Sequence, residues 1–110
     1  MELVDLSELV VDWSRAPATR TAGASAQATQ RVHQTGDVQL RIVDYDAGYL
    51  ADHWCSKGHI LYVISGGLTI EHSDGKESYE LAAGMSWQTS ENGSPHRVRS
   101  NGGARVFIVD

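Results

Sequence analysis

Short runs in which apolar and polar residues alternate, each closed by a turn signal, constrain the fold of this chain more than any other feature. In residues 38–42, Val, Leu and Ile alternate with Gln and Arg, which is the period of two expected of a half-buried strand. Residues 59–65 (HILYVIS) are mostly apolar, β-branched or aromatic, and residues 104–109 have the same character. We therefore predict a central strand at 59–65 and a further strand at 104–109.

Turn signals separate the predicted strands. Gly66-Gly67 is expected to turn the central strand, and residues 73–76 contain the Asp-Gly pair of a tight hairpin whose second strand would be 77–81. Two more strands are expected, one around Trp87 and one starting at His96. About eight strands spaced every 8–12 residues, with no good interior helix, predict an all-β sandwich or barrel, with a jelly roll among the candidates.

The first 25 residues differ from the rest of the chain. They include APATRTAGASA, which is rich in small and polar residues, and residues 6–9 have the pattern of a single helical turn. A chain of 110 residues can bury one hydrophobic core but not two independent ones. We therefore predict one domain over residues 1–110, with an N-terminal arm at 1–25 and a barrel at 26–110.

Charge and composition exclude several classes of partner. The net charge of −5 argues against a nucleic-acid partner, because affinity for phosphate backbones depends on clustered Lys and Arg. No stretch approaches the roughly 20 apolar residues of a membrane helix, and the acidic start MELVDLSE lacks the positive region of a signal peptide. The only cysteine, Cys55, cannot form an internal disulfide, which agrees with a reducing compartment. We expect a soluble, cytoplasmic protein without membrane contact.

Residues 52–59 (DHWCSKGH) place two histidines and the only cysteine close together. In an extended strand His53 and Cys55 project from the same face, and His59 has the same parity if the strand resumes after residues 56–58. His96, from a remote strand, could reach the same place across a closed barrel. Imidazoles and a thiolate favour Zn, Fe, Ni or Cu over Mg or Ca, so the residues indicate a transition-metal site.

The same residues carry a resemblance to a known family. The run from Gly48 through ADHWCSKGH to Gly66 resembles the first motif of the cupin superfamily, and the run from Gly84 to Pro95-His96 resembles the second. More narrowly, these runs and the sequence FIVD at 107–110 are similar to small single-domain bacterial cupins named for their Asp-His-Cys-Trp motif. The resemblance spans about residues 37–110 and implies a cupin-type double-stranded β-helix, that is, a jelly-roll barrel with an N-terminal arm.

The resemblance also implies a ligand set and a kind of activity. His53 matches the first ligand histidine of the motif, Cys55 stands where the second histidine is usual, His59 stands at the glutamate position, and His96 matches the last histidine. It implies a divalent Zn, Fe, Ni or Cu ion, a small polar substrate inside the barrel, and oxygenase or isomerase chemistry. A non-catalytic module that binds a small ligand or a metal is the alternative. Like other small cupins, the chain is expected to form a homodimer, with residues 106–109 as a candidate contact.

Each of these residues also has a simpler interpretation. The three histidines could be ordinary hydrogen-bonded side chains, and Cys55 could be a small packing residue, which would leave three histidines as ligands. Asp52 is expected to be a hydrogen-bond acceptor. Trp87 and Tyr62 could line the pocket or the core, and Arg97 could receive an anionic substrate or lie on a solvated strand face. Metal content would decide between the enzyme and the binding module.

Overall fold

The computed structural model describes residue 3 and residues 6–110. These residues contain strands and turns but no helix, and therefore no helical segment that could cross a membrane. The nine strands of the described residues are β1 (Thr19–Ala22), β2 (Gln27–Thr35), β3 (Val38–Tyr45), β4 (Tyr49–Leu50), β5 (His59–His72), β6 (Tyr79–Ala82), β7 (Ser86–Thr89), β8 (His96–Ser100) and β9 (Ala104–Val109).

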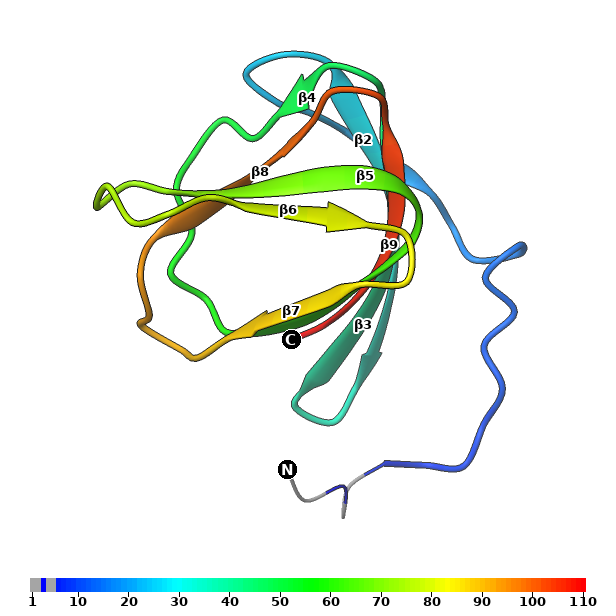
Figure 1. Cartoon of the computed structure of the whole chain (residues 1–110). Helices are drawn as coiled ribbons and strands as arrows, with labels where there is room; N and C mark the ends of the chain where they lie inside the picture. The colour runs from blue at the N-terminus through cyan, green and yellow to red at the C-terminus, as the bar shows by residue number, and fades with distance from the viewer. Residues whose placement is uncertain (1–2, 4–5) are drawn as a thin grey trace.

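All the strand pairs are antiparallel, and the strands curl around a common interior (Figure 1). The main path of hydrogen-bonded neighbours is β1-β2-β3-β9-β5-β8-β4, while β6 and β7 also pair with β5. The first part of β5 pairs with β7 and β9, and its last part pairs with β6 and β8. One strand therefore belongs to both faces of the barrel, and the predicted all-β jelly-roll class is confirmed.

The expected turn at Gly66-Gly67 is wrong, because β5 continues through both glycines. The strand bends there: its pairing with β9 shifts register between Val63 and Ser65, and Gly66 has a φ of 78°. A Cβ on Gly66 would lie only 2.2 Å from the carbonyl oxygen of Gly103, so no larger residue fits. The glycines let one strand pass from one face of the barrel to the other.

The hairpin after β5 is longer than predicted. Gly75 has the positive φ of a turn residue, but β6 pairs with β5 only as far as Tyr79 opposite Ile70. The remaining end of β5 pairs instead with β8, which places His72 opposite His96. Residues 73–78, between β5 and β6, therefore form a wider loop than a tight two-residue turn.

Residues 6–18 form no helix or strand and run outside the barrel (Figure 1). The helical turn expected at 6–9 is not formed; a turn occurs instead at 13–15. The ring of Trp13 packs edge-on against Phe107 with the ring centroids 6.4 Å apart. β1 lies inside the predicted arm and pairs with β2 along its whole length. The bounds of arm and barrel at 25 and 26 stay a prediction.

The core lies between the two faces of the barrel and is apolar. Along β5 the buried Leu61 and Val63 alternate with the exposed Ile60, Tyr62 and Ile64, as the period of two requires. Among the described residues, two polar residues are buried as a whole, and both come from β8. The buried apolar residues are Ala28, Val43, Leu61, Val63, Leu68, Ile70, Leu81, Ala104, Val106 and Ile108, and the buried polar residues are His96 and Ser100.

Candidate metal centre

Three of the four predicted ligand residues meet in the structure. Each of Cys55, His59 and His96 offers one ligand atom, and these atoms all lie within 4.8 Å of one another. Cys55 comes from the segment between β4 and β5, His59 begins β5, and His96 begins β8. Two backbone hydrogen bonds, of 2.8 and 2.9 Å, join Cys55 to His96 and hold the two segments together.

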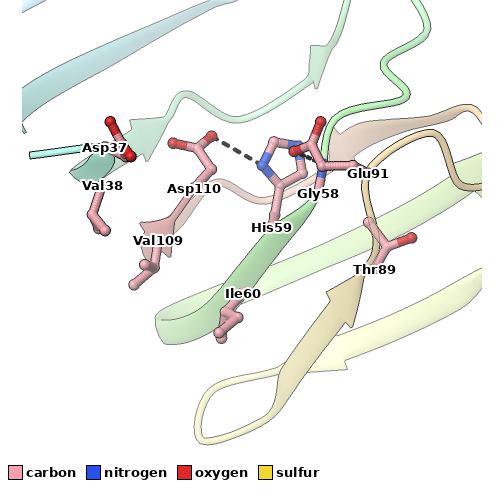
Figure 2. Close-up of a pocket in the computed structure, with 9 residues that line it drawn as sticks. All are labelled: Asp37, Val38, Gly58, His59, Ile60, Thr89, Glu91, Val109 and Asp110. Carbon is pink, nitrogen blue, oxygen red and sulfur yellow. Dashed lines mark hydrogen bonds and ion pairs between the residues drawn. The ribbon is translucent and has the colours of Figure 1, made fainter. Parts of the chain in front are cut away.

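The ring of His59 is oriented by a buried carboxylate. Its Nδ1 lies 3.0 Å from Oδ2 of Asp110, an interaction drawn as a dashed line in Figure 2. The other ring nitrogen, Nε2, lies 3.7 Å from Sγ of Cys55. Because a carboxylate only accepts hydrogen bonds, Nδ1 carries the proton and Nε2 turns its lone pair toward the thiol.

His96 is buried and lacks a hydrogen-bond partner on one ring nitrogen. The residue is 3% exposed, and its Nδ1 has no partner among the described residues. The ring packs edge-on against Trp87 at 4.8 Å and against His59 at 5.1 Å between centroids. Buried polar atoms in native proteins are almost always satisfied, so this nitrogen is one that a group from outside the chain could satisfy.

The surroundings favour neutral imidazoles, which is the form that binds metals. Burial lowers the pKa of His59, with Arg41 and Lys57 lowering it further while Asp110 acts to raise it. Burial also lowers the pKa of His96, and the charge of His59 adds to that effect, while the nearby backbone of Ser94 acts to raise it. Both rings are therefore ready to donate a lone pair at neutral pH.

A transition-metal ion fits this group of side chains. The donors are one sulfur and two imidazoles, which suit zinc and other borderline or soft ions. The backbone N–H of Lys57 points at Sγ of Cys55 from 3.4 Å, which is the kind of contact that stabilises a thiolate. Three protein donors would leave at least one coordination position for water or substrate.

His53 does not join this cluster. Its side chain is 76% exposed, and Nδ1 lies 2.7 Å from the Asp52 carboxylate. Strand parity predicted His53 beside Cys55, but residues 51–58 bend and contain only an isolated bridge at Cys55. Without an extended strand the two side chains need not share a face.

Only one of the three predicted pocket residues lies at the cluster. Trp87 walls the cluster, since its ring lies 6.5 Å from that of His59 in addition to its contact with His96. Tyr62 is on the outer face of the barrel because it alternates with the buried Leu61 and Val63. Arg97 follows the inward-facing His96 and turns outward, where it bonds Glu71 at 3.1 Å and lies over the Trp54 ring.

Two residues near the cluster were missed by the sequence analysis. Asp110 bonds His59, and Arg41 donates from Nη2 to the same Asp110 oxygen at 2.8 Å. Asp110 follows β9 and Arg41 lies in β3, so only the folded sheet brings them together. The sequence held no motif that could have indicated them.

A shallow cleft adjoins the cluster on the side of His59 and Asp110 (Figure 2). Its volume is about 240 Å³. Glu91 accepts a hydrogen bond from the N–H of Gly58 at its edge, at 2.8 Å. The lining residues are Asp37, Val38, Gly58, His59, Ile60, Thr89, Glu91, Val109 and Asp110.

No protein-family profile matches the chain, and no curated protein matches it. Solved structures do match. A predicted oxalate decarboxylase from Thermotoga maritima is 12% identical, with a TM-score of 0.78 over 92% of this chain and 96% of the other. An RmlC-like cupin from Shewanella frigidimarina is also 12% identical, with a TM-score of 0.75 over 96% and 92% of the two chains. Ectoine synthase from P. lautus is 19% identical, with a TM-score of 0.74 over 93% and 76%. The predicted cupin-type fold is thereby confirmed.

Proposed function

We propose that this cupin-fold protein binds a divalent transition-metal ion through Cys55, His59 and His96, and that it acts on a small polar molecule beside the ion. One observation carries the proposal: one ligand atom from each of Cys55, His59 and His96 lies within 4.8 Å of the other two, on side chains that are buried or half-buried. A bound ion would bring these donors together around one centre.

The donor set favours zinc, iron, nickel or copper. Such an ion polarises a bound oxygen atom or activates water or dioxygen. The residues of the chain would hold and orient the ion, and Trp87 would exclude water from one side. Redox-active iron or copper would favour oxygenase chemistry, whereas zinc or nickel would favour isomerase or hydrolytic chemistry.

A second function is a non-catalytic module that binds a metal or a small ligand. The size of the cleft favours it, because about 240 Å³ is below the roughly 300–1,000 Å³ of typical ligand pockets. In that case the ion would be structural or stored, and no substrate would turn over.

The experiment is elemental analysis of freshly purified protein and of single variants. Cys55→Ser, His59→Ala and His96→Ala should each lower the metal content sharply. His53→Ala is the matched control, because His53 belongs to the same sequence motif but lies outside the cluster. It should keep full metal content.

Full metal occupancy in all three cluster variants would contradict the proposed site. Loss of metal in His53→Ala alone would instead support the ligand assignment implied by the sequence motif. Metal-loaded wild-type protein that turns over no oxidisable or isomerisable small molecule would favour the binding module.

We further propose that the chain belongs to the small cupins with the Asp-His-Cys-Trp motif, on the residues Asp52 to Cys55 and the run to His59. The order of Trp54 and Cys55 is reversed relative to that name. An alignment of homologues in which Cys55 and His96 vary together would support the assignment.

A homodimer is proposed as the working assembly. Val106 and Ile108 are buried in the core, so the candidate contact on β9 is limited to the outward Phe107 and Val109. Ile60, Tyr62 and Ile64 of the adjacent β5 are exposed on the same outer face. Sedimentation at micromolar concentration tests the proposal, and a 12 kDa monomer would contradict it.

A further inference from the structure

Asp110 lies where three strands of the barrel meet. It directly follows β9, which pairs with both β3 and β5. Backbone hydrogen bonds in both directions join Asp110 to Gln39, at 2.6 and 2.9 Å. The backbone of Asp110 is therefore fixed, and its side chain points inward with only 1% of its surface exposed.

One oxygen of this carboxylate accepts two hydrogen bonds from different strands. Oδ2 lies 2.8 Å from Nη2 of Arg41 and 3.0 Å from Nδ1 of His59. The pairing of β3 with β9 places Arg41 opposite the buried Ile108, so the guanidinium faces the interior. Arg41 thus supplies the counter-charge and fixes the oxygen that His59 uses.

We infer that Asp110, held by Arg41, is a positioning residue that keeps His59 in its Nδ1–H tautomer and aims Nε2 at the metal site. The inference rests on the proposed function, since it assigns Asp110 a role toward the ion that His59 would bind. Such a carboxylate partner fixes the ring orientation of a ligand histidine and makes the imidazole a stronger donor.

The Arg41–Asp110 pair differs from an ion pair that serves stability alone. Burying a carboxylate is costly unless all its lone pairs are used, yet Oδ1 of Asp110 and Nε of Arg41 have no partners among the described residues. The other carboxylates paired with arginine among the described residues belong to Asp12, Asp44, Asp46 and Glu71; all are more exposed than Asp110, and none bonds a histidine. The distinguishing feature of Asp110 is its contact with His59.

The test is to read the tautomer of His59 by ¹⁵N NMR of the metal-free protein. In wild type, Nδ1 should carry the proton. Asp110→Ala removes the acceptor and should shift His59 toward the Nε2–H form, whereas Asp110→Asn keeps an oxygen at the same place and should largely retain Nδ1–H. Asp44→Asn, which removes the charge of a remote ion pair, should change nothing.

The same variants are then titrated with Zn²⁺ or Co²⁺ against a chelator. Asp110→Ala should weaken metal binding by about 10–100-fold, Asp110→Asn should fall between it and wild type, and Asp44→Asn should match wild type. If Asp110→Ala does not fold, the double variant Arg41→Met/Asp110→Leu replaces both charges, an exchange that buried ion pairs often tolerate. It should show the same tautomer shift and loss of affinity.

An Nδ1–H tautomer and a metal affinity that both survive removal of the acceptor would overturn the inference. Failure of the proposed function looks different: wild-type protein would bind no metal, while the tautomer of His59 would still respond to Asp110. A tautomer in wild type with the proton on Nε2 would overturn the positioning role regardless of metal.

Discussion

The two ends of β8 each bury a polar side chain, and they do so in opposite ways. Ser100 is 1% exposed and donates its hydroxyl to the carbonyl of Gly67 at 2.7 Å. His96 is buried to almost the same degree, but its Nδ1 has no partner among the described residues. At the Ser100 end the chain satisfies the buried polar group itself, whereas at the His96 end one ring nitrogen is left for a group from outside to satisfy.

The largest change in the free energy of unfolding should come from truncating an apolar side chain that packs between the two ends of β8. Ile70 is fully buried opposite Val98, so Ile70→Ala should lower the free energy of unfolding by about 2–5 kcal/mol. The metal content of the folded protein should stay the same, because the cluster does not depend on this side chain. Urea unfolding and elemental analysis measure the two quantities. A loss of metal without a loss of stability would mean that the two regions are not separate.

Metal should stabilise the His96 end and leave the Ser100 end unaffected. Excess ion at about 100 times its dissociation constant would raise the free energy of unfolding by about 2.7 kcal/mol. A chelator should reverse the gain, and His96→Ala should abolish it while Ser100→Ala keeps it. Thermal unfolding with and without metal measures this effect. If metal stabilised His96→Ala and Ser100→Ala equally, the proposed difference between the two ends of β8 would be contradicted.

Ser100→Ala should have a smaller effect. It removes one hydrogen bond from Gly67, which is worth about 1 kcal/mol of unfolding free energy. The metal affinity should be that of wild type, since Ser100 lies at the opposite end of β8 from His96. Chemical denaturation and a metal titration of the same sample check both statements. A tenfold loss of affinity would show that the two ends are coupled.

The smallest effect should be a pH dependence confined to the His96 end. Burial lowers the pKa of His59 and His96 below 6.5, so the unfolded chain binds more protons than the native protein below that pH. The charged or titratable neighbours are Asp110, Arg41, Lys57 and His72. Stability of the metal-free protein is therefore fully present above about pH 6.5 and falls as the pH drops through the lowered pKa values. Denaturant midpoints from pH 8 to 5 measure it, and a midpoint that rises toward pH 5 would contradict the sign.

The fold was largely predictable because its signals are local. Period-two alternation and turn residues predicted the strand at 104–109 with the bounds of β9, and the comparisons confirm the cupin-type barrel. The exception is Gly66-Gly67, where a bent strand and a turn need the same residue type. Only the approach of Gly103, far along the chain, distinguishes the two cases.

The candidate site was predictable only in part, because its contacts are not local. Cys55, His59 and His96 do come together, although their role as ligands stays a prediction. The alternation of Arg41 with apolar neighbours indicates a solvent-facing arginine, but the register with β9 turns it inward toward Asp110. No pattern in the sequence predicts which side chain on another strand will contact Arg41.

The position of β9 determines when the barrel can assemble during folding. This strand lies between β3 and β5 in the sheet but follows both of them in the chain. As the polypeptide leaves the ribosome, β3 and β5 therefore keep open edges until β9 has been synthesised, and pairings over such long separations form slowly. Until that moment the nascent chain exposes strand edges that can pair with other chains.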